Sequence, residues 1–169
     1  LTKSDGDVYT LQEKDGTIYT FGDATHKKLT AITDRQGNKT ELTYDNASSL
    51  LTQIKDDVNH TITLTYTDSL LTQASASFHN GSIKYEYDSK KRLKKRTDAM
   101  GYSTLYAYTD ENRIERITDA NGHKTMIAYS PAGMCSRIKT DVTDKSIRYE
   151  GTKTVFIDYT EPKNIYSYF

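Results

Sequence analysis

The chain has 169 residues, of which 35% are hydrophobic, and it contains 14 Tyr and no Trp. Its 23 basic and 23 acidic side chains give a net charge of zero, which argues against a general binder of nucleic acid or of anionic membranes. No run approaches the roughly 18 apolar residues of a membrane-spanning helix, and a single cysteine, Cys135, excludes an internal disulfide.

An aromatic residue recurs along the chain in successive steps of 23, 22, 21, 21 and 21 residues. A repeat of this length is one small unit that becomes stable only against its neighbours. The low apolar content then fits a thin, one-layer sheet with a tyrosine-rich face. The positions of this column are Phe21, Tyr44, Tyr66, Tyr87, Tyr108 and Tyr129.

Each copy predicts a β-hairpin. In the copy from Tyr102 to Gly122, apolar and polar residues alternate with period two up to Tyr108, which indicates a strand. A turn-forming cluster follows, and Ile114 to Asp119 predicts the second strand. The predicted strand pairs, in chain order, are Tyr19–Phe21 with Leu29–Ile32, Leu42–Tyr44 with Leu51–Ile54, Leu64–Tyr66 with Leu71–Ala74, Tyr85–Tyr87 with Leu93, Thr104–Tyr108 with Ile114–Asp119, and Ile127–Tyr129 with Ile138, with weaker copies around Tyr9 and Ile147 and a last alternating run at Val155–Tyr159.

The fold predicted for residues 1–169 is therefore all-β, a single array of about seven tandem hairpins. About fourteen antiparallel strands exceed what an open sheet carries without curling, so we expect an arc or spiral. Aromatic residues at i and i+2 share a face, and we expect column neighbours to stack into a ladder across strands. No helix signal is present.

The second strand of each hairpin leaves two alternatives open. Leu29 and Ile32 lie three residues apart, as do Ile114 and Ile117, so a regular strand would place them on opposite faces. Either this strand carries a β-bulge, or both faces of the sheet are partly covered.

These copies resemble the YD repeat of the Rhs family. The likeness rests on Tyr44-Asp45, on Tyr87-Asp88 and on the phrase Ile-Thr-Asp-x-x-Gly, which starts at Ile32 and again at Ile117. It covers nearly the whole chain. Thr67 and Thr109 each separate a Tyr from its Asp, Ser130-Pro131 follows Tyr129, and the usual Gly-Arg-Leu is approximated by Lys91-Arg92-Leu93 and Asn112-Arg113-Ile114.

The resemblance implies a non-catalytic structural function. YD repeats build hollow β-shells that enclose a toxic C-terminal domain in Rhs toxins, wall-associated proteins and the cocoon of Tc toxins, and that serve adhesion in teneurins. The expected partners are the rest of the shell and the enclosed domain, in a secreted or cell-surface bacterial protein. The chain begins and ends within the pattern and lacks the family's Pro- and Asp-rich self-cleavage segment, so we expect a piece of shell wall.

No enzyme, metal or cofactor site is predicted. The four histidines fall in or beside turns without metal-ligand spacing; they are His26, His60, His79 and His123. Cys135 occupies the column of Leu93 and Ile114, which predicts a buried apolar substitute. The turn aspartates stand too far apart for a calcium loop and are interpreted as turn residues; they are Asp34, Asp98 and Asp119.

Two further patterns have simple interpretations. The basic run Ser89–Arg96 lies on a hairpin turn, which favours a solvated turn pairing with acids of neighbouring units over a polyanion site. Four Asn-x-Ser/Thr triplets are interpreted as turn residues, although in a eukaryotic extracellular protein they could carry glycans; they begin at Asn38, Asn46, Asn59 and Asn80.

A binding module is the alternative function. Tyrosine faces stack on sugars, so Tyr85, Tyr87, Tyr106 and Tyr108 are candidate residues for binding a cell-surface or cell-wall glycan. The competing interpretation is that the same rings pack the sheet together. Unpaired strands at the ends of such an array also predict edge-to-edge association with another copy.

Overall fold

The computed structural model describes residues 2–4, 8–22, 27–160 and 164–168. Every regular element in these ranges is a β-strand, and none of the described residues forms a helix able to cross a membrane. The prediction of an all-β chain is confirmed.

The strands fall into two compact units, residues 1–85 with 98–100 (unit 1) and residues 86–97 with 101–169 (unit 2). Those wholly or mainly in unit 1 are β1 Thr2–Ser4, β2 Val8–Gln12, β3 Ile18–Phe21, β4 Leu29–Thr33, β5 Lys39–Tyr44, β6 Leu51–Lys55, β7 Thr61–Thr67, β8 Leu70–Ala76 and β9 Ser82–Tyr87. Those in unit 2 are β10 Leu93–Thr97, β11 Ser103–Tyr108, β12 Ile114–Thr118, β13 Lys124–Tyr129, β14 Cys135–Lys139, β15 Asp144–Glu150, β16 Lys153–Asp158 and β17 Asn164–Tyr168.

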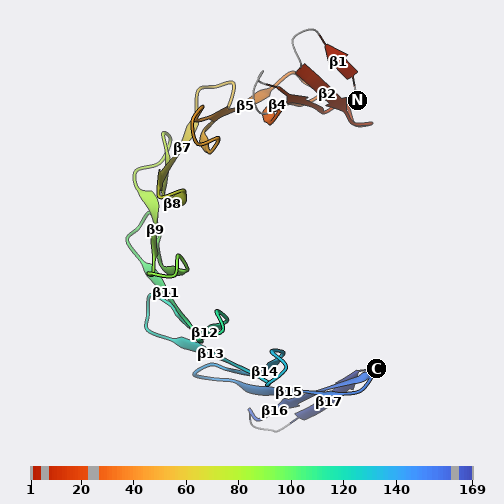
Figure 1. The fold of residues 1–169 in the computed structure, drawn as a ribbon, viewed down its shortest axis with the longest axis vertical. Helices are drawn as coiled ribbons and strands as arrows, with labels where there is room; N and C mark the ends of the chain where they lie inside the picture. Colours follow the sequence, from red (N-terminus) through yellow and green to blue (C-terminus); the bar gives the residue numbers. More distant parts are fainter. Residues whose placement is uncertain (1, 5–7, 23–26, 161–163, 169) are drawn as a thin grey trace. The chain divides into compact units, whose positions relative to one another are not determined.

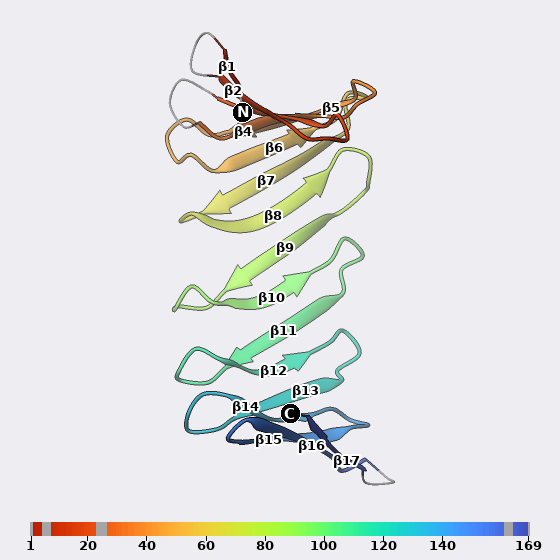
Figure 2. The same ribbon diagram turned by 90° about the vertical axis from the view of Figure 1, so that its right-hand side faces the viewer.

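Strands that follow one another in the chain pair antiparallel. This holds from β1 to β9 in unit 1 and from β10 to β17 in unit 2. Figure 2 shows this order, with β6, β7 and β8 side by side in one unit and β11, β12 and β13 in the other. Figure 1 shows no helix over either unit. Sequential hairpins, as predicted, are the architecture.

One face of each unit carries the column tyrosines, and we call it the tyrosine face. Exposure alternates along β5, β7 and β13, with the tyrosine side half-buried and the other side exposed. In β11 the residues opposite Tyr106 and Tyr108 are Ile117 and Ile114, and directly opposed residues share a face. Apolar residues of both strands therefore lie on the tyrosine face.

A β-bulge in the second strand of the hairpin brings these apolar residues to one face. Of the two alternatives that the sequence left open, the bulge is therefore the correct one. Tyr108 pairs with Ile114 while Ala107 pairs with Arg116, so Glu115 is an extra residue that brings Ile114 and Ile117 to one face. The same shift occurs in five hairpins, where the extra residues are Thr30, Thr52, Thr72, Glu115 and Ser136. The hydroxyls of the three threonines donate to carbonyls of the facing strand at 3.1–3.3 Å.

The sheet has almost no buried core. Among the described residues only Ala31 and Val155 are buried, at 5% and 4% exposure. The column side chains are half-buried because neighbouring hairpins, and no second layer, shield them. Stability must therefore come from contacts between successive hairpins, as in other repeat proteins, and the predicted thin sheet is confirmed.

In six of the described hairpins the turn has a left-handed residue two positions before the residue that pairs with, or aligns with, the column aromatic. The residues there have positive φ: Lys27 (48°), Ser49 (60°), Ser69 (64°), Lys91 (62°), Asn112 (64°) and Gly133 (81°). Only Gly133 is a glycine, although glycine alone adopts this conformation without steric cost. The Gly of the Gly-Arg-Leu phrase thus marks a backbone geometry that the other five copies keep without glycine.

Replacing Lys91 with Gly is expected to stabilise the chain by about 1 kcal/mol, because a left-handed L-residue is strained by that amount. Urea denaturation of the purified chain measures the change. Lys90→Gly, one residue earlier in the same turn, is the control and should be neutral or destabilising. Equal loss of stability in both variants would show that the backbone at Lys91 is unstrained.

Candidate functional site

The column tyrosines make one bond that recurs in both units. In four hairpins the hydroxyl donates to the backbone carbonyl of the residue fifteen positions earlier, in the preceding hairpin. The pairs are Tyr44 Oη to Leu29 O (3.0 Å), Tyr66 Oη to Leu51 O (2.9 Å), Tyr108 Oη to Leu93 O (2.8 Å) and Tyr129 Oη to Ile114 O (2.7 Å). We call each of these bonds a tyrosine clasp.

The clasp forms where the backbone ladder between hairpins stops. Strands β12 and β13 share three pairs, of which Arg116 with Met126 is the last toward the bulge. Ile114 lies two residues beyond that pair, and the Tyr129 hydroxyl satisfies its carbonyl. Because an unpaired, partly buried carbonyl is costly, the clasp completes the seam between two hairpins.

Two of the clasp hydroxyls have a raised pKa. Desolvation raises the pKa of Tyr44 and is the largest cause of the raised pKa of Tyr108. A tyrosine is protonated at neutral pH even at its ordinary pKa, as donation to a carbonyl requires, and the raised values keep these two hydroxyls donors at more alkaline pH.

A cation covers the ring in three of the clasps. Lys28 lies 4.7 Å from the centre of the Tyr44 ring, Arg92 4.6 Å from that of Tyr108, and Arg113 5.5 Å from that of Tyr129. Each cation directly precedes the residue whose carbonyl accepts the clasp. Such contacts stabilise by about 0.5–1 kcal/mol at exposed sites and more when desolvated.

Arg92 is the most connected of these cations. It donates from Nε to Asp88 Oδ2 at 2.7 Å, and from Nη1 to the carbonyl of Thr109 at 3.2 Å and to Asn112 Oδ1 at 3.0 Å. Its side chain is only 21% exposed. Arg92 thus ties its own turn to the turn of the next hairpin.

The predicted ladder of stacked rings is not found at two of its steps. No ring pair joins Tyr44 to Tyr66 or Tyr108 to Tyr129, and the ring contact that the described residues show is between His60 and Phe78, at 5.1 Å. The rings are separated because each one lies under a cation or reaches toward a carbonyl. Polar bonds, and not ring stacking, join successive hairpins.

The turn aspartates act as predicted. Asp119 Oδ1 accepts the backbone N–H groups of Asn121 and His123, both at 2.9 Å, and Asp34 makes the equivalent pair of bonds. Asp98 accepts from Met100 at 3.0 Å. Across the described ranges, no three His, Cys, Asp or Glu side chains lie close enough to hold a metal ion.

Hydroxyl residues replace the aspartate where it is missing. Thr109 and Ser130 follow the column tyrosine in place of Asp, and their Oγ atoms accept from the N–H groups of Arg113 (3.4 Å) and Met134 (3.3 Å). Thr140 replaces the second turn aspartate and accepts from Thr143 N at 2.9 Å. The departures from the Tyr-Asp pattern therefore preserve the turn.

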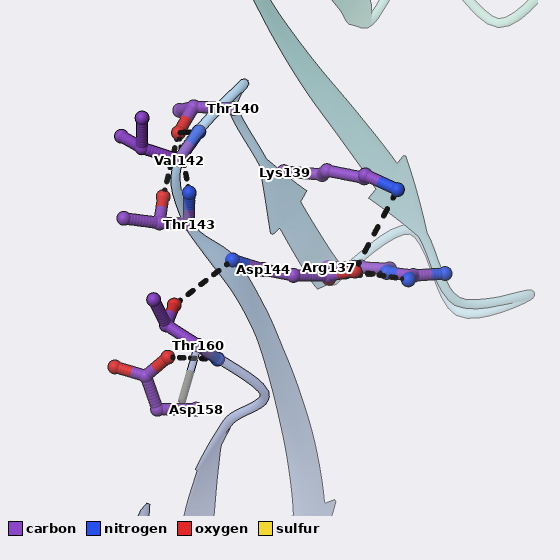
Figure 3. A network of polar contacts seen from close by, with 8 residues as sticks. All are labelled: Arg137, Lys139, Thr140, Val142, Thr143, Asp144, Asp158 and Thr160. Atoms are coloured by element: carbon purple, nitrogen blue, oxygen red, sulfur yellow. Dashed lines mark hydrogen bonds and ion pairs between the residues drawn. The ribbon is translucent and has the colours of Figure 1, made fainter. Parts of the chain in front are cut away.

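Figure 3 shows how this last turn continues into the tail of unit 2. Asp144 accepts from Arg137 Nε at 2.7 Å and lies 3.9 Å from Lys139 Nζ. Its backbone N–H donates to Thr160 Oγ1 at 3.4 Å. The network links β14, β15 and the turn after β16, and its cations are paired within the sheet.

The histidines lie where the sequence placed them, with His26 outside the described residues. His60, His79 and His123 are exposed turn residues. Nδ1 of His60 lies 2.9 Å from Asp56 in its own turn, and Nδ1 of His123 lies 2.7 Å from Asp141 in the neighbouring turn. Both are exposed pairs, and the second joins two neighbouring turns.

The hydrogen bond from His123 to Asp141, followed by the charges of Asp119 and Asp141, raises the pKa of His123 above its ordinary 6.5. Its stabilising contribution is therefore full below pH 6.5 and is lost as the pH rises through the raised folded value. We expect Asp141→Asn to lower the pKa of His123 in an NMR titration. An unchanged titration in that variant would contradict the pairing.

The basic run and Cys135 differ partly from expectation. Lys94 and Lys95 pair with Glu86 of their own hairpin, at 3.8 and 3.1 Å, whereas the prediction invoked acids of neighbouring units. Cys135 lies opposite Tyr129 in the predicted column, but it is half-buried because no second layer covers it. The four Asn-x-Ser/Thr asparagines are exposed and lie in or beside turns.

The candidate glycan residues have unequal surroundings. Tyr85 lies in unit 1, and the other three lie in unit 2. Arg92 covers the Tyr108 ring, and the clasp engages its hydroxyl. The groove lined by Leu105, Arg116 and Lys124 lies on the opposite face of the sheet, because these residues alternate with Tyr106 and its partner Ile117. Sugar stacking at these residues stays a prediction.

Comparison with known proteins gives the fold a context. Residues 80–124 match a family model described as RHS Repeat, and no curated protein matches the chain. The fold is similar to that of the Photorhabdus luminescens Tc holotoxin pore, with a TM-score of 0.62, 14% identity and coverage of 83% of this chain and 8% of that one.

Two crystal structures show the same likeness. The TcdB2-TccC3-Cdc42 complex has a TM-score of 0.65 at 15% identity, covering 89% of this chain and 10% of that chain. TcdB2-TccC3 has a TM-score of 0.62 at 15% identity, with the same coverage. The chain thus spans about a tenth or less of the solved chains it resembles.

Proposed function

We propose that the chain is a segment of shell wall, because residues 80–124 match the RHS Repeat model and hairpins of the same pattern lie on both sides of them. In this proposal it is a non-catalytic scaffold that encloses or presents another domain of a secreted or cell-surface bacterial protein. In this proposal the end strands join further wall strands or another copy.

The tyrosine clasp is the observation that carries the proposal. The same bond, at the same spacing of fifteen residues, joins hairpins in both units. Turn aspartates, clasp tyrosines and ring-covering cations all bond to the sheet's own backbone or side chains. Such chemistry suits a wall whose function is to stay closed over something else.

The similar structures support this proposal through their size. The match extends over 83–89% of this chain but 8–10% of the Tc toxin chains. A segment with no buried core of its own gains its stability from further repeats on either side. We therefore propose that the longer wall encloses the other domain and that this segment forms one part of that wall.

Protease protection of the domain downstream in the parent protein tests the proposal. We expect the domain to resist a protease, and we expect clasp variants (Tyr→Phe at Tyr44, Tyr66, Tyr108 and Tyr129 together) to shorten that protection. Tyr→Phe at Tyr85 and Tyr106, whose hydroxyls make no described hydrogen bond, is the matched control. Equal cleavage in parent, clasp variant and control would contradict an enclosing wall.

Glycan binding is the second candidate, and it rests on Tyr85 and Tyr106, whose hydroxyls make no described hydrogen bond. It predicts that the chain is retained on cell-wall polysaccharide and that Tyr106→Ala abolishes retention while the circular dichroism spectrum is unchanged. If the unmodified chain is not retained either, glycan binding is contradicted and the tyrosine face serves the wall alone.

A further inference from the structure

The dipeptide Asn-Gly occurs twice in the chain, as Asn80-Gly81 between β8 and β9 and as Asn121-Gly122 between β12 and β13. Both asparagines are exposed. In such a pair the glycine nitrogen can reach the preceding side-chain amide carbon and close a five-membered ring, because glycine has no Cβ to obstruct the approach. The two turns hold this nitrogen differently.

In the turn between β12 and β13, the nitrogen is engaged. Gly122 N–H donates to the carbonyl of Asp119 at 3.1 Å, while Asp119 Oδ1 holds the N–H groups of Asn121 and His123. Ring closure would require this bonded nitrogen to lose its proton and leave its acceptor. The turn aspartate therefore protects Asn121.

In the turn between β8 and β9, that aspartate is missing. Ala76 stands five residues after Leu71, where Asp119 stands five after Ile114, and the segment up to the next column tyrosine is one residue longer. The bonds in this turn are from Ser77 N to Thr61 O and from His79 N to Ala76 O. Among the contacts that the structure describes here, none engages the Gly81 N–H or the Asn80 amide.

We propose that Asn80 is a site of spontaneous deamidation and that Asn121 is protected. The Gly81 nitrogen attacks Asn80 Cγ, the new N–Cγ bond forms as the Cγ–Nδ2 bond breaks, and ammonia leaves with the proton from Gly81. Water then opens the succinimide at either carbonyl, which gives aspartate or isoaspartate. No oxidant, enzyme or cofactor takes part.

The product matters because Gly81 is packed. A Cβ placed on Gly81 would lie 2.6 Å from the carbonyl oxygen of Ala99, in the next turn along this edge of unit 1. Isoaspartate lengthens the main chain by one carbon directly before this glycine and adds a negative charge. We expect the turn between β8 and β9 to detach from residues 98–100 and to expose the apolar groove lined by Ile62, Ala74 and Ile83.

Peptide mapping by mass spectrometry of the full chain, incubated folded at mildly alkaline pH, tests the proposal. We expect Asn80 to convert several-fold faster than Asn121, and isoaspartyl methyltransferase to label the Asn80 peptide. In urea the two sites should convert at similar rates, because the local dipeptide is the same. Equal rates in the folded chain, or no conversion at Asn80, would overturn the proposal.

Asp119→Ala is the complementary variant. It removes the carboxylate that organises the second turn, and we expect Asn121 to convert several-fold faster while Asn80 keeps its rate. Circular dichroism checks that the variant remains folded, and the rate in urea gives the upper limit for an unprotected site. An Asn121 rate that stays at its original value in the folded variant would contradict protection by the turn.

Discussion

Replacing Tyr108 with Phe is expected to lower the free energy of unfolding by about 1 kcal/mol, because it leaves the Leu93 carbonyl without its donor. The hydroxyl is the only group that this change removes, and the 2.8 Å hydrogen bond is lost with it. The same change at Tyr44, Tyr66 and Tyr129 should cost a similar amount. Tyr108→Ala also removes the half-buried ring and should cost about 2–3 kcal/mol. Urea denaturation measures all of these variants.

Tyr85→Phe and Tyr106→Phe are the controls, since neither hydroxyl has a described hydrogen bond. Both tyrosines lie on the tyrosine face two residues before a column position, so the aromatic ring and its surroundings are matched. We expect changes within about 0.5 kcal/mol, as for other substitutions that remove no bond. If clasp and control variants lose equal stability, the clasp is not what joins the hairpins.

Arg92→Met is expected to destabilise the chain by about 2 kcal/mol, because methionine keeps much of the apolar stem but loses the guanidinium bonds and the contact with the Tyr108 ring. The lost partners are Asp88, the Thr109 carbonyl and Asn112. Arg92→Lys should recover only part of the loss, since an ammonium cannot make the planar, forked set of bonds.

Lys94→Met in the same basic run is the control for Arg92. Its side chain is 51% exposed and lies 3.8 Å from Glu86, an arrangement worth about 0–1 kcal/mol. Both variants remove one positive charge, so they separate the net charge of the turn from the geometry of Arg92. Similar stabilities for the two variants would show that Arg92 is an ordinary solvated charge.

Strand positions could be predicted from the sequence because alternation with period two reflects a physical asymmetry between the two faces of a sheet. The spacing of three residues between Ile114 and Ile117 predicted either a bulge or two partly covered faces. Only the pairing of the strands in the structure showed that the bulge is correct. The burial of Cys135 was overestimated because the column pattern gives the face of a residue but not whether a second layer covers it.

The tyrosine clasp could not be predicted from residue types, because a tyrosine hydroxyl and a backbone carbonyl give no sign in sequence of which ones meet. One signal was present: Tyr44, Tyr66, Tyr108 and Tyr129 each follow a Leu or Ile by fifteen residues. The repeat step of 21 residues gave no sign of the longer turn before β9. Tyr66 and Leu71 are one residue closer together than Tyr108 and Ile114, and this shortening offsets the extra residue in the turn.

Cryo-electron microscopy of the whole parent protein would show whether this segment forms part of a shell. We expect the hairpins to lie in a wall around an enclosed domain, with Tyr108 Oη within hydrogen-bond distance of the Leu93 carbonyl and Tyr129 Oη within that distance of the Ile114 carbonyl. A segment that stands apart from any shell, with its tyrosines turned to solvent or bound to glycan, would contradict it.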